Sequence, residues 1–289
     1  MAQQEAGVSD YVLTLTCPEQ LGIVHAVAGF LVENGCDIVD NRQFDSERFY
    51  MRVHFRTHSH SREVTLDALR TDFARTASLY DMEWQLNDLA ARPRVLIMVS
   101  RFGHCLNDLL YRWQTGQLKI DVPLIVSNHT DFWRLADSYG IPFAHVPVTR
   151  ETKPDAEARL LDLIVRNNIE LTVLARYMQV LSDDLCQKLD GRVINIHHSF
   201  LPSFKGAKPY HQAFDRGVKV VGATAHYVTP DLDEGPIIEQ EVIRVDHTQD
   251  PEQLAVAGRD AECLALARAV QWHVERRVLL NGTRTVVFK

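Results

Sequence analysis

The chain has few cysteines, and none of them belongs to a recognisable motif. Its 289 residues include five cysteines, no two of them within ten residues of each other. Neither a CxxC pair nor the ligand spacing of a zinc site is therefore present. An odd number of widely spaced cysteines is typical of a reducing compartment, in which each is a small buried residue. We therefore expect a cytoplasmic protein.

Long apolar runs and runs of one charge are also missing. Residues 1–10 have no apolar segment of the kind found in signal peptides, and no apolar stretch approaches the roughly 20 residues of a membrane helix. The net charge is −7, with acidic and basic residues mixed along the chain and no basic run. We therefore expect neither a membrane nor a nucleic acid as a partner.

Glycine is scarce at the point where a nucleotide site would need it. The first turn between a buried strand and a helix in the larger half of the chain, residues 100–105, reads SRFGHC and contains one glycine. Neither GxGxxG nor a Walker loop is present. A dinucleotide or ATP site of those types is therefore not expected.

The first 88 residues show strand and helix patterns in the order β-α-β-β-α-β. Apolar residues alternate in the strand segments and recur at helical spacing in the other two. This order is the split βαβ of a ferredoxin-like fold. The segments are 11–16, 21–33, 36–44, 49–55, 64–77 and 80–86.

The turn after the first strand resembles that of ACT domains, small regulatory modules of metabolic enzymes. The resemblance lies in Pro18, Gly22 and Ile23 and in the segment NGCDI at residues 34–38. It implies paired modules that bind an amino acid near this turn, where free N–H groups at a helix N-terminus suit a carboxylate. A module that only assembles the protein is the alternative. We expect a homo-oligomer, with an amino acid as the candidate effector.

Strand and helix patterns alternate through the rest of the chain. The segment 94–100 is an almost continuous apolar run, as expected for a strand that is buried on both faces. The alternation predicts parallel βαβ units in a doubly wound α/β sheet. The expected domains are an ACT-like domain at 1–88, a linker at 89–93 and a catalytic α/β domain at 94–289.

An amide, an imidazole and a carboxylate stand at strand ends and in loops between residues 193 and 240. Asn195 and His197 end a short apolar strand, and Asp233 lies in an acidic turn after the strand 220–228. If the strands are neighbours, the trio suits attack on a carbonyl by water or an amine: the amide stabilises the oxyanion, the histidine transfers protons and the carboxylate sets its tautomer. A structural histidine and a solvated turn are the alternative, and spacing leaves both open.

The same stretch is similar to the formyltransferase family that uses 10-formyltetrahydrofolate. The similarity extends over about residues 93–280. It implies that Asn195, His197 and Asp233 are catalytic, and that no metal and no cofactor are required, because the folate is a substrate. The segments that carry it are NIH at 195–197, LPSFKG at 201–206, GATAHYV at 222–228 and LDEGPII at 232–238.

The resemblance also implies a site for the folate ring. The segment LARYMQVLS at 174–182 matches the family's pterin-binding segment, with the loop 229–233 on the other side of the ring. His198 either shapes a water pocket or packs under the loop, and Lys205, His211 and His226 are pocket or structural residues, with a structural role favoured for His226. The implied substrate-binding residues are Met178, Gln179, Val180, Leu181, His198 and Thr229.

Two departures from the glycinamide ribonucleotide formyltransferases favour water as the acceptor. Those enzymes hold the acceptor's phosphate with a turn rich in glycine and asparagine, where this chain has RFGH at 101–104. They also tend to have proline where this chain has His198. An ACT-like module followed by HHSFLP at 197–202 is similar to the branch in which water replaces the amine.

The resemblance thus implies hydrolysis of 10-formyltetrahydrofolate to formate and tetrahydrofolate. The formate would supply purine synthesis, and the reaction would balance one-carbon pools. Formyl transfer to an unidentified amine is the alternative enzyme activity. A folate-binding or amino-acid-sensing protein without catalysis is the alternative from another class.

Overall fold

The computed structural model describes residues 8–57, 65–203 and 209–289. The chain divides into two compact units, and the expected domain boundaries remain predictions. Residues 275–279 and 286–289, at the end of the chain, cluster with the N-terminal unit. The first unit comprises 1–92, 275–279 and 286–289, and the second comprises 93–274 and 280–285.

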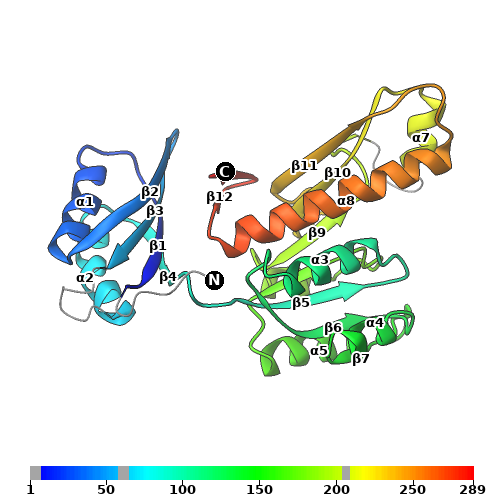
Figure 1. Ribbon diagram of the computed structural model, residues 1–289, viewed down its shortest axis with the longest axis horizontal. Coiled ribbons are helices and arrows are strands. Elements are labelled where there is room, and N and C mark those ends of the chain that lie inside the picture. The colour runs from blue at the N-terminus through cyan, green and yellow to red at the C-terminus, as the bar shows by residue number, and fades with distance from the viewer. Residues whose placement is uncertain (1–7, 58–64, 204–208) are drawn as a thin grey trace. The chain divides into compact units, whose positions relative to one another are not determined.

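The first unit is a four-stranded antiparallel sheet with two helices on one face (Figure 1). Its strand order is β2-β3-β1-β4, so the two central strands are β3 and β1. The order of elements along the chain is the predicted βαββαβ. The elements are β1 Asp10–Cys17, α1 Ile23–Glu33, β2 Cys36–Asp45, β3 Phe49–Thr57, α2 Leu66–Leu79 and β4 Glu83–Asp88.

The two helices of this unit turn their apolar residues to the sheet. Gly22, at φ 97°, precedes α1, and Thr65 caps α2 by accepting a hydrogen bond from the backbone of Ala68. Phe73 contacts Phe30 and Trp84 edge to face, with ring centroids 4.9 Å apart in both pairs. This core holds the helices on one face of the sheet.

The second unit is a seven-stranded, mostly parallel sheet in the order β11-β10-β9-β8-β5-β6-β7. Strands β9, β8, β5, β6 and β7 run parallel, and β10 runs antiparallel to both of its neighbours. The chain winds outward from β5 in both directions, which confirms the doubly wound fold. The strands are β5 Arg94–Val99, β6 Asp121–Ser127, β7 Phe143–His145, β8 Leu171–Leu174, β9 Val193–His197, β10 Val220–Tyr227 and β11 Ile237–Arg244.

Helices cover this sheet, and the longest of them, α8, lies along β9, β10 and β11 (Figure 1). Helix α3 packs against α8, while α5 and α6 pack on the sheet face that carries Leu96 and Met98. A short hairpin of β12 Val278–Asn281 and β13 Arg284–Val287 ends the chain. The helices are α3 His104–Gln114, α4 Trp133–Ser138, α5 Lys153–Arg166, α6 Asp183–Lys188, α7 Pro209–Asp215 and α8 Pro251–Val274.

The winding of the sheet determines where a ligand binds. Strand β6 follows β5 on one side and β8 lies on the other, so the order reverses between β5 and β8. In doubly wound folds, ligands bind outside the carboxyl ends of the strands at this reversal. Asn195 and His197 lie towards the carboxyl end of β9, the strand next to β8 on the side away from β5.

Two further features concern the hydropathy of the helices and the state of the cysteines. No helix within the described residues is long and apolar enough to cross a membrane. The five cysteines are free thiols, and four of them are buried.

Candidate active site

A cavity of about 580 Å³ opens at the carboxyl ends of β8 and β9 and under the loop after β10. Its volume falls in the range of typical small-molecule sites, and its lining mixes apolar side chains with a few polar ones. Each of the nine site residues expected from the sequence lines it. They are Met178, Gln179, Val180, Leu181, Asn195, His197, His198, Thr229 and Asp233.

The antiparallel pairing of β9 and β10 brings the polar groups together. In this register Asn195 lies opposite His226, and the loop after β10 returns over the strand ends. Asp233 sits in this loop at φ 58°, a left-handed conformation that asparagine and aspartate tolerate best among non-glycine residues. Gly235 follows, where a Cβ would lie 1.8 Å from the carbonyl oxygen of Tyr227. The loop therefore needs glycine there to bring Asp233 down onto β9.

His197, which is buried, pairs with Asp233, which is half-buried. The Nδ1 atom of His197 lies 3.2 Å from Oδ1 of Asp233. The hydrogen bond from His197 lowers the pKa of Asp233 against the opposing effect of burial, so this side chain is a carboxylate. Nδ1 then carries the proton, which leaves the lone pair on Nε2. That Nε2 atom is buried and has no hydrogen-bond partner among the described residues.

His226 fixes the amide of Asn195. Its Nδ1 donates to the carbonyl oxygen of Tyr227 at 2.8 Å, so its Nε2 accepts from Nδ2 of Asn195 at 3.3 Å. Burial lowers the pKa of His226, which keeps the ring neutral and this tautomer in place. One N–H of the amide is used in this way, and its second N–H is left to bind substrate. His226 therefore holds the amide of Asn195 in place while also lining the cavity, and the structural role expected from the sequence remains a prediction.

His198 is half-buried beside His197, with ring centroids 5.1 Å apart. Burial, with the charges of Arg176 and His197, lowers the pKa of His198 to about 4. The ring is therefore neutral at physiological pH. It lines the cavity and can form hydrogen bonds there without adding a charge.

Replacing His198 with glutamine tests this pKa through stability. Between pH 6.5 and 4, His198 binds a proton in the unfolded chain but stays neutral in the folded chain. The free energy of unfolding therefore falls as the pH is lowered through this window. Relative to His198→Gln, native protein should lose roughly 3 kcal/mol between pH 7 and pH 4. Urea unfolding of both proteins at several pH values measures this difference. The exposed His211 is the matched control, and a difference that is constant with pH would contradict the assignment.

Ser100 ties three strand ends together beside the cavity. Its hydroxyl donates to Oδ1 of Asn128 at 2.7 Å and accepts from the backbone N–H of Met178 at 2.9 Å. Its own N–H donates to the carbonyl of Arg176 at 3.2 Å. The first residues of the segment 176–181 are thus fixed to the ends of β5 and β6.

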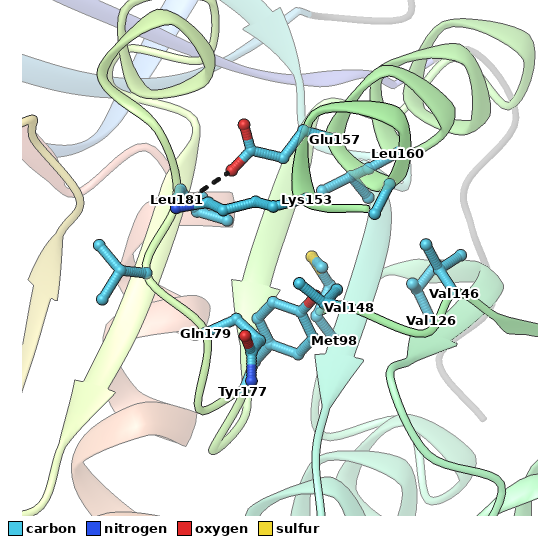
Figure 2. Close-up of a pocket in the computed structure, with 12 residues that line it drawn as sticks. Met98, Val126, Val146, Val148, Lys153, Glu157, Leu160, Tyr177, Gln179 and Leu181 are labelled. Atoms are coloured by element: carbon cyan, nitrogen blue, oxygen red, sulfur yellow. Dashed lines mark ion pairs between the residues drawn. The ribbon is translucent and has the colours of Figure 1, made fainter. Parts of the chain in front are cut away.

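The far side of the same segment is held by α5. The Oε1 atom of Glu157 accepts the backbone N–H of Ser182 at 2.8 Å and lies 3.9 Å from Nζ of Lys153. Figure 2 shows Glu157 and Lys153 extending from α5 towards Leu181, at a small cavity of about 10 Å³ behind the segment. Tyr177 fills the opposite side of this small cavity beside Met98 (Figure 2). The segment is therefore shaped in advance, which favours ligand binding.

Removing the carboxylate behind the segment should weaken substrate binding and leave the chemistry intact. We expect Glu157→Ala to raise KM for the folate about tenfold, because a hydrogen bond to a charged group contributes about 1.5 kcal/mol or more. The value of kcat should stay within about twofold of native. Steady-state kinetics give both constants, and Asp162→Ala, an exposed acidic residue on the same helix, is the control. A loss confined to kcat would contradict this role.

Some side chains near the site were not assigned from the sequence, and some candidates lie elsewhere. Arg176 and Phe102 both line the cavity, although no role was expected for either. His211 is exposed on α7 and does not line the cavity, and Lys205 lies outside the described residues. Arg176 could have been found from the sequence, because it lies within the segment that the resemblance assigns to the pterin. Phe102 lies in the first turn, from which only the absence of a phosphate site was predicted.

Comparison with known proteins identifies the family of the second unit. Residues 93–270 match the family described as formyl transferase. This match covers more than half of the chain and contains every cavity residue named above. The chain therefore belongs to the formyl transferase family.

Relatives that match almost the whole chain define the branch. The chain is 57% identical to a formyltetrahydrofolate deformylase of Corynebacterium sp. (strain P-1), over 96% of this chain and 98% of the relative. The crystal structure of formyltetrahydrofolate deformylase from Burkholderia mallei ATCC 23344 is 55% identical, with a TM-score of 0.92 over 97% of this chain and all of the other. Within the family, this chain thus stands with the formyltetrahydrofolate deformylases.

The transferases of the same family match less of the chain. Glycinamide ribonucleotide transformylase 1 from Symbiobacterium toebii is 27% identical, with a TM-score of 0.65 over 71% of this chain and 98% of that structure. The deformylases therefore match the chain along nearly its whole length, whereas the match to this transferase covers only part of the chain.

Proposed function

We infer that the chain has formyltetrahydrofolate deformylase activity and hydrolyses 10-formyltetrahydrofolate to formate and tetrahydrofolate. Identity of 57% to a deformylase across nearly the whole chain carries this conclusion. The cavity agrees with it, because it places an amide, an imidazole and a carboxylate in one wall, which is the set that attack on a formyl carbon requires.

We propose that the folate ring lies along residues 178–181, with the loop from Thr229 to Asp233 on its other side. This places the formyl group against Asn195 and His197. Met178 has its backbone N–H bound to Ser100, so this N–H is not available to the ring. The rigid attachment of the segment at both ends supports this proposal.

In the proposed mechanism, Asp233 orients the attacking water and supports positive charge on His197. The water oxygen bonds to the formyl carbon as one of its protons passes to Nε2 of His197, and the resulting oxyanion is stabilised by the free N–H of Asn195 and by the His197 cation that this transfer creates. The bond from the formyl carbon to N10 then breaks, and N10 takes a proton from His197 directly or through water. Formate and tetrahydrofolate are the products.

Formate release without an added acceptor tests the activity. We expect native protein to release one formate for each tetrahydrofolate formed from 10-formyltetrahydrofolate alone. A protein that releases none, but transfers the formyl group once an amine is supplied, would instead be a formyltransferase.

We also propose that the first unit is an ACT-like regulatory module that binds an amino acid. Supporting this, Gly22 at φ 97° opens the first turn of α1, where backbone N–H groups suit a carboxylate. A thermal shift assay with single amino acids tests the idea. No shift with any of them would leave assembly as the module's role.

We propose that the chain forms a homo-oligomer through an edge strand of the first sheet. Strand β2 is an edge strand of ten residues, and most of its side chains, including Ile38, Val39 and Phe44, are exposed. A long exposed edge strand readily pairs with another chain. Sedimentation that shows a monomer at working concentration would overturn the proposal.

The cellular setting is proposed from the same observations. Free thiols throughout fit a cytoplasmic protein. The formate released there would supply purine synthesis, and the hydrolysis would balance the one-carbon pools. Deleting the gene and measuring folate-bound formyl groups tests this, since an unchanged pool would contradict it.

A further inference from the structure

A buried carboxylate on α8 gathers three donors beside the cavity. Glu262 is 1% exposed, and its Oε2 accepts from Nε2 of His104 at 2.7 Å. The same oxygen lies 3.3 Å from Nε of Arg176, and Oε1 accepts from the hydroxyl of Tyr210 at 3.1 Å. Burial alone would raise the pKa of Glu262, but the hydrogen bond from His104 and the charge of Arg176 hold it below its ordinary value. The carboxylate is therefore ionised and balances Arg176.

Arg176 occupies a backbone position that suits glycine. Its φ is 64°, in the left-handed region where a non-glycine residue is strained. Its carbonyl accepts from the N–H of Ser100, which fixes this conformation at the end of β8. Strain of this kind at the wall of a cavity points to a use for the side chain.

The guanidinium of Arg176 has an N–H donor without a hydrogen-bond partner among the described residues. The residue is 8% exposed, and its Cζ lies 5.4 Å from the ring centroid of Phe102, which lines the same cavity. Its Nη1 is buried and makes no hydrogen bond with any described residue, a property shared by Nε2 of His197 in the same cavity, whereas its Nε faces the carboxylate of Glu262. A buried donor without a partner costs free energy, so these atoms mark a place where a small polar ligand binds.

The three side chains His104, Cys105 and Glu262 also place ligand atoms within 4.8 Å of one another. Glu262 nevertheless faces cationic Arg176 with the same oxygen that contacts His104. A second cation there would repel the guanidinium, so the cluster is best described as an ion pair that anchors Arg176.

The hydrolysis itself produces the anion that such an arginine suits. Water adds its oxygen to the formyl carbon, the bond to N10 breaks, N10 takes one proton of the water, the other proton passes to solvent, and a small carboxylate, formate, is left in the cavity. Transfer to an amine leaves no such anion. A guanidinium binds a carboxylate through parallel, charge-assisted N–H bonds. Resting on the proposed hydrolysis, we propose that Arg176, anchored by Glu262, binds the carboxylate of the formate product.

Binding of formate to the full chain tests this site without turnover. Carbon-13 formate is titrated in the presence of tetrahydrofolate and followed by NMR line width, and formate is also assayed as a product inhibitor. We expect Arg176→Met to weaken formate binding about ten- to a hundredfold, because hydrogen bonds between charged groups are lost. Arg176→Lys keeps the positive charge but loses the parallel N–H bonds, so it should weaken formate binding less than Arg176→Met does. Arg101→Met, an exposed arginine of the first turn outside the cavity, is the matched control and should bind formate as native protein does.

Other results would overturn the proposal. If Arg176→Met binds formate as tightly as native protein does, Arg176 does not form the formate site. A higher KM for the folate with unchanged formate binding would assign Arg176 to the carboxylates of the substrate's glutamate tail instead. If Arg176→Met fails to fold because Glu262 is left unpaired, Arg176→Met/Glu262→Gln removes both charges and answers the same question. Native protein that binds formate but releases none from the folate would refute the hydrolysis and leave the site standing.

Discussion

Replacing Asp233 with asparagine should lower kcat by roughly 10²–10⁴-fold and leave KM for the folate almost unchanged. The carboxylate lies 3.2 Å from Nδ1 of His197, and in the proposed mechanism its charge supports the imidazolium that forms during attack. Asparagine keeps the shape and tolerates φ 58°, so the loop should keep its conformation while the charge is lost. Steady-state hydrolysis measures both constants.

Asp231 is the matched control for this variant. It lies in the same loop, is exposed and does not line the cavity, so Asp231→Asn should keep kcat within about twofold of native. Similar losses in both variants would attribute the effect to the charge of the whole loop. Full activity of Asp233→Asn would remove Asp233 from the mechanism.

Replacing Asn195 with alanine should lower kcat by roughly 10²–10³-fold, because the N–H donor to the oxyanion is lost. The substitution also leaves Nε2 of His226 without its donor, which should destabilise the second unit by about 1–3 kcal/mol. Kinetics and urea unfolding separate the two effects. The activity loss should persist under conditions in which the variant is fully folded.

His226 and Asn107 provide the comparisons for that experiment. His226→Leu removes only the anchor of the amide, so we expect an intermediate fall in kcat of about tenfold with KM unchanged. Asn107→Ala changes an exposed asparagine on α3 and should have no effect on kcat. If His226→Leu were as inactive as Asn195→Ala, the histidine itself would contact the reacting group.

Much of the fold follows from periodicity in the sequence. The apolar run from residue 94 is β5 in the centre of the sheet, and the polar break at residues 45–48 lies at the turn between β2 and β3. Two of the short helices, α6 and α7, were not anticipated. Helix α6, Asp183–Lys188, has six residues, too few for a helical apolar pattern, although Ser182 accepts a hydrogen bond from Leu185 as a cap.

The site depended on resemblance more than on pattern. Strand periodicity placed Asn195 and Asp233 near strand ends, but their meeting requires the antiparallel register of β9 and β10, which no local pattern encodes. The contact between Arg176 and Glu262 joins the end of β8 to α8, elements far apart in the chain. Such long-range pairs depend on how the whole unit packs, so local patterns do not reveal them.

The most direct test of the hydrolysis is the origin of the oxygen in formate. Native protein is mixed with 10-formyltetrahydrofolate in water enriched in oxygen-18, with no amine present, and the formate is analysed by mass spectrometry. If water is the acceptor, each formate released carries one oxygen atom from the solvent, and the label appears as fast as tetrahydrofolate. Release of tetrahydrofolate without labelled formate would contradict the account and indicate transfer of the formyl group to another acceptor.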